Sequence, residues 1–199
     1  MTKIKLCGLK EERHIRWANE ARCDYIGFVF APSRRHVSFE KAKELRMLLS
    51  PSILPVGVFA DAPIEEILSL CRASIISLVQ LHGTEEESYI QELRKQCQLP
   101  IIKAIDATDK TALRLGLDSS ADYVLLDAKK GGSGVSFDWE LTKTCTRPFF
   151  LAGGLHPRNL EEAITKTRAY AVDLSSGLEE GGEKTRGRML EATRIAHAL

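Results

Sequence analysis

Short apolar runs alternate with longer amphipathic stretches along the chain. The runs are rich in Val, Ile, Leu and Phe and are almost continuously hydrophobic, which is typical of strands in a parallel sheet that is covered on both faces. They comprise residues 4–8, 25–30, 54–60, 76–83, 100–106, 122–128, 148–154 and 170–177. The pattern therefore predicts eight strands, each followed by a helix.

Capping signals mark some of the helices between these runs. Ser38 is the predicted N-cap of the helix that follows it. Thr84 and Glu87 have the spacing of a capping box, which predicts a helix that starts near Thr84. The other predicted helices cover residues 11–23 or begin near Pro63, Asp109, Phe137, Pro157 and Lys184.

Eight strand–helix units close naturally into a (β/α)8 barrel, the TIM barrel, and 199 residues would make a compact one. An open doubly wound sheet is the alternative, because periodicity does not show closure. The segment CGLKEE after the first strand, however, lacks the G-x-G-x-x-G fingerprint of dinucleotide-binding folds. No linker or strong repeat interrupts the chain, so we expect residues 1–199 to form one domain.

Composition narrows the classes of function. The chain is 44% hydrophobic and 28% charged with a net charge of +1, and its basic residues are mixed with acids, which argues against a nucleic-acid partner. Charge enters early, at Lys3 and Lys5, and no apolar run approaches a membrane span, so we expect no membrane partner and a cytoplasmic location. The 5 cysteines are scattered without C-x-x-C spacing, which favours reduced thiols over a disulfide framework or a zinc site.

Two glycine-rich stretches follow the seventh and eighth predicted strands. LAGGL contains Gly153 and Gly154, and DLSSGLE contains Ser176 and Gly177. Backbone N–H groups of such loops, and of a short helix starting at Ser175 or Ser176, can approach an anion. These two loops are where phosphate commonly binds in this fold, so the sequence predicts a phosphorylated ligand. Two ordinary glycine turns are the alternative.

A thiol and a carboxyl group end two strands that are otherwise apolar. Cys7 precedes Gly8, and Asp127 ends the run YVLLD. We expect helix N-termini around the barrel mouth to lower the pKa of Cys7 and burial to raise the pKa of Asp127. The pair would then provide a base and an acid for proton transfer on a sugar carbon. For Cys7 alone, a buried core residue is the common alternative.

Three further features invite functional hypotheses. Residues 129–137, KKGGSGVSF, have the composition of a mobile loop that could close as a lid or could be a plain connector. Arg35, beside Arg34, has a planar fork that suits a carboxylate, although adjacent basic residues are often solvated surface. We expect His82 to pack or hydrogen-bond rather than bind metal, because no second ligand stands at a matching strand end.

An ordered set of motifs runs from Lys3 to about Glu179. It consists of KLCG, GFVF with S-x-R-x-V-S, VGVF, VQLHG, LLD with GGSG and F-D-W, LAGGL-x-P-x-N and AVDLSSGLE. This set resembles the phosphoribosylanthranilate isomerase family of tryptophan biosynthesis. The resemblance implies a (β/α)8 barrel without metal or cofactor. It also implies an Amadori rearrangement of N-(5-phosphoribosyl)anthranilate to 1-(2-carboxyphenylamino)-1-deoxyribulose 5-phosphate, so the expected partner is this phosphosugar-anthranilate substrate.

The resemblance further implies roles for individual residues. Cys7 would be the general base, Asp127 the general acid, and Arg35 the group that holds the anthranilate carboxylate. The residues implied to hold the phosphate are Gly153, Gly154, Ser176 and Gly177, and those implied to line the pocket are Asp173 and His82.

The chain departs from the family pattern at residues 179–188. The family usually continues with G-x-K-D, whereas EGGEKTRGR places Thr185 where the acid is expected, so the form of this loop is not predicted. The sequence leaves open a monomer or a homodimer, as well as association with the next enzyme of the pathway.

Rival functions differ in the residues that they would require. The sister isomerase of histidine biosynthesis would be expected to carry an aspartate in place of Cys7. A metal-dependent ribulose-phosphate epimerase would need His and Asp ligands at several strand ends. A non-catalytic phosphate-binding barrel would have no need of both Cys7 and Asp127.

Overall fold

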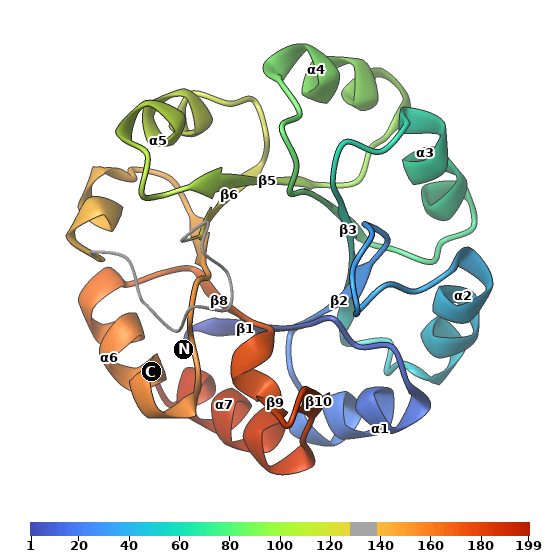
Figure 1. Ribbon diagram of the computed structural model, residues 1–199, viewed down its shortest axis with the longest axis vertical. Coiled ribbons are helices and arrows are strands. Elements are labelled where there is room, and N and C mark those ends of the chain that lie inside the picture. Colours follow the sequence, from blue (N-terminus) through green and yellow to red (C-terminus); the bar gives the residue numbers. More distant parts are fainter. Residues whose placement is uncertain (128–138) are drawn as a thin grey trace.

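The computed structural model describes residues 1–127 and 139–199. Within these residues, strands β1 to β8 are parallel and pair in sequence order, and β8 pairs with β1 to close a barrel. Helices surround this barrel (Figure 1). The predicted TIM barrel is therefore confirmed, and the open sheet is excluded.

The bounds of the elements agree closely with the apolar runs. The strands are β1 (Lys3–Cys7), β2 (Tyr25–Val29), β3 (Leu54–Phe59), β4 (Leu78–Leu81), β5 (Ile101–Asp106), β6 (Tyr123–Asp127), β7 (Phe149–Leu151) and β8 (Ala171–Leu174), with a short hairpin of β9 (Glu179–Glu180) and β10 (Glu183–Lys184). The α-helices are α1 (Glu12–Ala21), α2 (Phe39–Leu48), α3 (Ile64–Arg72), α4 (Glu87–Gln96), α5 (Lys110–Leu117), α6 (Pro157–Thr167) and α7 (Arg186–Ala198). Two 3-10 helices, η1 (Trp139–Thr144) and η2 (Ser176–Leu178), complete the described elements.

One of the two capping predictions is confirmed and the other is wrong. The Ser38 side chain accepts a hydrogen bond from the backbone N–H of Lys41 at 3.2 Å, so Ser38 caps α2. Helix α4 instead begins at Glu87 with Glu86 as its N-cap, so Thr84 lies two residues before the cap, where its hydroxyl donates to the Asp61 carboxylate at 3.0 Å. The capping box fails because Asp61, on a different loop, accepts hydrogen bonds from both the backbone N–H and the hydroxyl of Thr84 and so holds this residue outside the helix.

The connection between β6 and β7 differs from the expected α-helix where it is described. Phe137, the predicted helix start, and the predicted lid at residues 129–137 lie outside the described residues. The described part is η1, a 3-10 helix. The hydroxyls of Thr142 and Thr144 each donate to the backbone carbonyl three residues earlier at 2.7 Å, and such local bonds compete with regular α-helical pairing.

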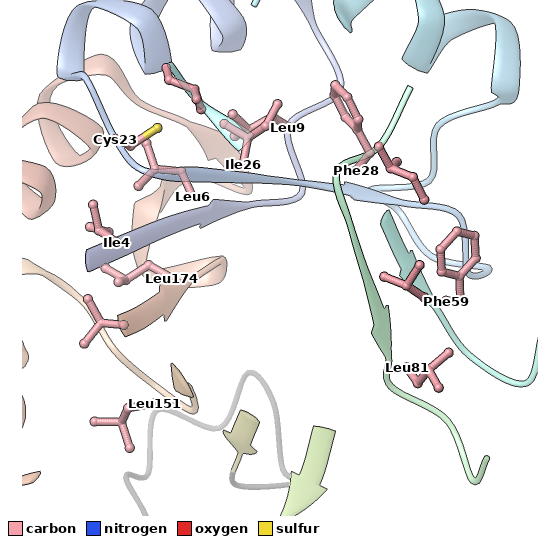
Figure 2. Close-up of a cluster of buried hydrophobic side chains, with 14 of the residues drawn as sticks. Ile4, Leu6, Leu9, Cys23, Ile26, Phe28, Phe59, Leu81, Leu151 and Leu174 are labelled. Atoms are coloured by element: carbon pink, nitrogen blue, oxygen red, sulfur yellow. The ribbon is translucent and has the colours of Figure 1, made fainter. Parts of the chain in front are cut away.

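Alternate residues of each strand face the helices or the barrel interior, as the period of a strand requires. Ile4, Leu6, Ile26 and Phe28 belong to the apolar layer between the barrel and its helices (Figure 2). These four side chains are fully buried and together fix which face of β1 and β2 points outward. The intervening residues of the same strands must therefore point into the barrel.

Aromatic rings fill the barrel interior at the amino-terminal end of the strands. Tyr25, Tyr123, Phe150 and Tyr170 lie ring against ring, with centroids 5.3 to 5.8 Å apart. Apolar neighbours such as Val56 pack against this group. Because this end of the barrel is filled, any ligand must enter from the carboxyl ends of the strands.

Among the described helices, none is both long enough and apolar enough to cross a membrane.

Candidate active site

A cavity of about 460 Å³ lies at the carboxyl ends of the barrel strands. Its lining contains eight of the nine predicted site residues, which are Cys7, Arg35, His82, Asp127, Gly153, Gly154, Asp173 and Ser176. The ninth, Gly177, lines an adjoining cavity of about 580 Å³ that shares Gly154 and Ser176 with the first. Residues from distant parts of the chain thus meet at the predicted end of the barrel.

Cys7 is the last residue of β1 and points into the barrel, with a relative exposure of 8%. It lies directly opposite Gly27 on β2, and a Cβ atom at residue 27 would lie only 2.6 Å from the sulfur. Burial raises the pKa of Cys7, and the nearby Lys5 ammonium lowers it less than burial raises it. The predicted net lowering by helix N-termini is therefore wrong, because desolvation of the thiolate dominates.

Asp127 ends β6 and reaches the same cavity, with its side chain 20% exposed. Its Oδ2 lies 3.5 Å from Nε2 of His82, which follows β4. The amide of Gln80 donates to His82 Nδ1 at 3.0 Å, so the neutral imidazole carries its proton on Nε2 and presents it to the carboxylate. This places His82 as a hydrogen-bonding residue beside Asp127. The other carboxylate oxygen, Oδ1, is buried without a hydrogen-bond partner among the described residues.

Arg35 lies at the rim of the cavity rather than on open surface. Its stem packs over Gly8, which has a φ of 78° and where a Cβ atom would lie 2.5 Å from Arg35 Cδ. Nε and Nη2 donate to the two carboxylate oxygens of Glu179 at 2.7 and 3.0 Å. An arginine has five N–H donors, so a second carboxylate can still be bound by the remaining ones.

Glu179 is a buried carboxylate that ties several cations together. Besides Arg35 it pairs with Arg34 at 2.5 Å and with the buried Lys184 at 3.0 Å. Burial alone would raise the pKa of Glu179, but hydrogen bonds from Arg35 and Lys184 bring it below its ordinary value. Lys184 also donates to the Ser175 carbonyl at 2.8 Å, which connects the group to the loop after β8.

The segment that departs from the family pattern therefore has a structural role. Residues 179–184 form the β9–β10 hairpin, whose turn contains Gly181 and Gly182 with φ of 58° and 87°. The hairpin carries both Glu179 and Lys184. It thus holds Arg35 at the cavity despite the divergent sequence.

The two predicted phosphate loops touch each other. Gly153 and Gly154 have φ of 88° and 65°, the left-handed region that favours glycine. Gly177, within η2, approaches the other loop so closely that a Cβ atom there would lie 1.9 Å from the Leu155 carbonyl oxygen. The absence of a side chain at residue 177 is therefore what allows the loops after β7 and β8 to meet.

Substitution of Gly177→Ala is expected to push the two loops apart. Overpacking of this kind typically costs about 1–3 kcal/mol, and the loss should appear in the free energy of unfolding measured with urea. Gly187→Ala is the matched control, since a Cβ atom at that position of α7 meets nothing within 4 Å. Equal effects of the two substitutions would contradict the close contact.

Among the described residues, one group of side chains has ligand atoms close enough together to bind a metal ion, and none of its members lines the cavity. Glu11, His14 and Glu183 offer ligand atoms within 4.8 Å of one another. The guanidinium of Arg13 pairs with Glu11 at 2.7 Å and with Glu183 at 3.2 Å. An ion-pair cluster accounts for this arrangement.

Several residues that shape the site were not predicted. They are Lys5, Gly27, Gln80, Glu179 and Lys184. The two-residue period of a strand could have indicated two of them. Lys5 stands two positions before Cys7, and Gln80 stands two positions before His82, so each faces the same side as the predicted site residue that follows it. The partners of Glu179 lie more than a hundred residues away or across a hairpin, and no local pattern encodes them.

Comparisons with known proteins agree with this geometry. Residues 4–192 match the family model described as N-(5'-phosphoribosyl)anthranilate (PRA) isomerase. A protein of that name from Endomicrobium trichonymphae is 44% identical over 203 residues and covers 100% of both chains. Two solved structures each superpose with a TM-score of 0.88 at 31% identity over 100% of both chains. One is a phosphoribosyl anthranilate isomerase in complex with reduced 1-(o-carboxyphenylamino)-1-deoxyribulose 5-phosphate, and the other consists of monomers of the dimeric enzyme of Thermotoga maritima.

Proposed function

Because the chain belongs to the N-(5'-phosphoribosyl)anthranilate isomerase family and is therefore an isomerase of tryptophan biosynthesis, we propose that the rearrangement takes place in the cavity at the barrel mouth. The reaction converts N-(5-phosphoribosyl)anthranilate into 1-(2-carboxyphenylamino)-1-deoxyribulose 5-phosphate. One observation carries the proposal for the site. Cys7 and Asp127 face a single cavity, and the glycine loops after β7 and β8 form its rim.

Cys7 and Asp127 divide the proton transfers between them. Asp127 in its protonated form gives a proton to the ribose ring oxygen, the ring opens, and a Schiff base forms between C1 and the anthranilate nitrogen. The Cys7 thiolate then removes the proton from C2, which yields an enolamine. Loss of the hydroxyl proton at C2 and addition of a proton at C1 give the ketone. The substrate as a whole gains and loses equal numbers of protons, as an isomerisation requires.

The cavity offers a distinct partner to each end of the substrate. The touching loops that contain Gly153, Gly154 and Ser176 supply backbone groups for the phosphate. Arg35 supplies its free N–H donors for the anthranilate carboxylate. The complex of a related enzyme with the reduced product analogue supports the assignment of this substrate class to the barrel. His82 and Asp173 also line this cavity.

The decisive experiment is a fluorescence assay of turnover. Phosphoribosylanthranilate is generated in place, the protein is added, and the disappearance of the fluorescent substrate is followed. We expect rapid loss of substrate fluorescence together with tight binding of the reduced product analogue. If the analogue binds but the substrate is not turned over, the binding sites for phosphate and carboxylate are supported, whereas the assignment of Asp127 as the acid and Cys7 as the base is wrong.

Substitution of Arg35→Ala is expected to raise the KM more than it lowers the kcat. The loss of a charge-assisted pair is worth about 1.5–3 kcal/mol, which corresponds to a roughly 10- to 100-fold rise in KM. Arg13→Ala is the control, because Arg13 pairs with Glu183 of the β9–β10 hairpin at 3.2 Å but does not line the cavity. A KM that is unchanged in the Arg35 variant would make this arginine only a structural partner of Glu179.

The expected partner is the phosphosugar-anthranilate substrate. A homodimer and docking to the next pathway enzyme remain predictions, which analytical ultracentrifugation of the protein alone and mixed with that enzyme would test. A cytoplasmic location likewise stays a prediction, to be tested by cell fractionation.

A further inference from the structure

Lys5 is an ammonium group that the barrel buries completely. It is one of the largest fully buried side chains of the described residues and points into the barrel from β1. Moving an unpaired ammonium from water into such an interior is strongly unfavourable. Its direct partner is Asp173, the register neighbour on β8, whose Oδ2 lies 2.9 Å from Lys5 Nζ. Burial alone would lower the pKa of Lys5, but Asp173 and Cys7 raise it, so Lys5 stays charged.

The same ammonium group adjoins the sulfur of Cys7. Lys5 and Cys7 stand two positions apart on β1 and so face the same side of the strand. A Cβ atom at Gly27 would lie 3.2 Å from Lys5 Nζ and 2.6 Å from Cys7 Sγ, so both atoms occupy the space that this glycine leaves. The described structure therefore brings one positive charge against the thiol from inside the barrel.

A thiolate in this position needs that charge. Burial disfavours a thiolate, and the phosphate and carboxylate of the substrate add negative charge to the cavity. The charged groups that act on Cys7 are Lys5 on its own strand, Asp173 on β8 and Lys184 on β10. Lys184 is tied to Glu179 at 3.0 Å, which offsets most of its charge. Lys5 is therefore the main cation available to stabilise the thiolate.

We propose that Lys5 is a positioning residue that holds Cys7 in its thiolate form for proton removal, while Asp173 orients the Lys5 ammonium group. The proposal rests on the function assigned to Cys7 above. Lys5 has no exposed surface and is absent from the cavity lining, so it acts through Cys7 and does not touch the substrate.

The test follows the thiol directly rather than turnover. The rate of alkylation of Cys7 by iodoacetamide is measured against pH, with the modified peptide quantified by mass spectrometry. Loss of the Lys5 charge destabilises the thiolate, so in Lys5→Met the pKa of Cys7 rises and the alkylation midpoint moves to higher pH. We expect a shift of at least about one pH unit, which is a tenfold slower reaction at neutral pH. The rising limb of kcat against pH should move with it.

Lys103→Met is the matched control. Lys103 on β5 is also a nearly buried lysine with a carboxylate partner, Glu85 at 2.7 Å, but it does not line the cavity. Its variant should keep the Cys7 midpoint. If Lys5→Met does not fold, Lys5→Met combined with Asp173→Asn removes both buried charges. The upward shift should then be smaller but keep its sign, because Lys5 influences Cys7 more strongly than Asp173 does.

The possible outcomes separate this proposal from the function on which it rests. An unmoved alkylation midpoint in the folded Lys5 variants, beside an inactive Cys7→Ser enzyme, overturns the role of Lys5 and leaves Cys7 as the base. Normal turnover by the Cys7→Ser enzyme overturns both the role of Lys5 and the assignment of Cys7 as the base.

An independent pair of thiols lies outside the active site. Cys71 in the last turn of α3 and Cys97 just after α4 have their sulfur atoms 3.6 Å apart. Cys71 is partly exposed, whereas Cys97 is buried. The hydrogen bond from Cys71 lowers the pKa of Cys97, so the inner sulfur is the more readily ionised.

We infer that Cys71 and Cys97 form a reversible disulfide when a small disulfide oxidant such as glutathione disulfide is present. The accessible Cys71 sulfur attacks one sulfur of the oxidant while the neighbouring Cys97 thiolate accepts the Cys71 proton, and one glutathione leaves and takes up that proton. Cys97 then attacks the Cys71 sulfur and releases the second. Two protein thiols are oxidised, one glutathione disulfide is reduced, and both protons leave with the glutathione thiols.

Mass spectrometry after exposure of the folded protein to glutathione disulfide tests this second inference. We expect the loss of two hydrogens, a cross-linked peptide containing both cysteines, a higher melting temperature and full reversal by dithiothreitol. In Cys97→Ser, a stable glutathione adduct on Cys71 should accumulate instead. An adduct on Cys71 that persists in the unsubstituted protein, or the absence of any reaction, would overturn the inference.

Discussion

Replacement of Cys7 by serine is expected to leave a folded protein that has lost most of its activity. The serine hydroxyl fits the space beside Gly27, since it is smaller than the thiol, but it gives up its proton far less readily. Loss of a positioned general base typically costs roughly 10²- to 10⁴-fold in rate, and we expect a fall in kcat of that size. The KM should change little, because binding rests on the phosphate loops and Arg35.

The assay of substrate fluorescence measures this loss, and circular dichroism verifies the fold. Cys145→Ser is the matched control, since Cys145 is half-buried near Arg147 and does not line the cavity. It should retain full activity. A Cys7→Ser enzyme with a rate close to that of the unsubstituted protein would remove the thiol from the mechanism.

Replacement of Asp127 by asparagine should be equally damaging for a different reason. The amide has the same shape and can still contact His82, but it cannot deliver a proton to the ring oxygen. We expect kcat to fall by roughly 10²- to 10⁴-fold while the reduced product analogue still binds. Calorimetric titration of that analogue separates the loss of chemistry from a loss of binding.

Asp106→Asn provides the comparison. Asp106 is the register neighbour of Asp127 and ends β5 as Asp127 ends β6, but its carboxylate accepts hydrogen bonds from Thr108 and does not line the cavity. Asparagine can accept the same bonds, so activity should be retained. Similar losses in both variants would indicate a general disturbance of the barrel rather than a specific proton donor.

The barrel was predictable because each strand carries its own signal. Eight apolar runs of strand length, separated by amphipathic stretches, are enough to define the order of the elements, and the polar residues that end these runs are enough to place Cys7 and Asp127 at one mouth. Local signals failed where a distant residue intervened. The Thr84 hydroxyl fits a capping box by spacing, yet Asp61 from the preceding loop binds it.

The electrostatics of the site were harder to predict for the same reason. Lys5 reads in the sequence as an ordinary charged residue near the start of the chain, and its burial depends on Asp173, which is 168 residues away. The pKa of Cys7 was expected to fall, but the expectation considered helix ends and did not include the depth of the thiol. The burial of Lys5 and the pKa of Cys7 both depend on the pairing of β1 with β8, and this pairing exists only in the closed barrel.

The seam between β1 and β8 has a consequence for how the enzyme is made. During synthesis Lys5 and Cys7 leave the ribosome before Asp173, which follows Lys5 by 168 residues. The Lys5–Asp173 pair beside the thiol therefore cannot form until β8 has docked against β1. Contacts of such long sequence separation form slowly, so recovery of activity during refolding should report on closure of the seam rather than on the earlier appearance of helices.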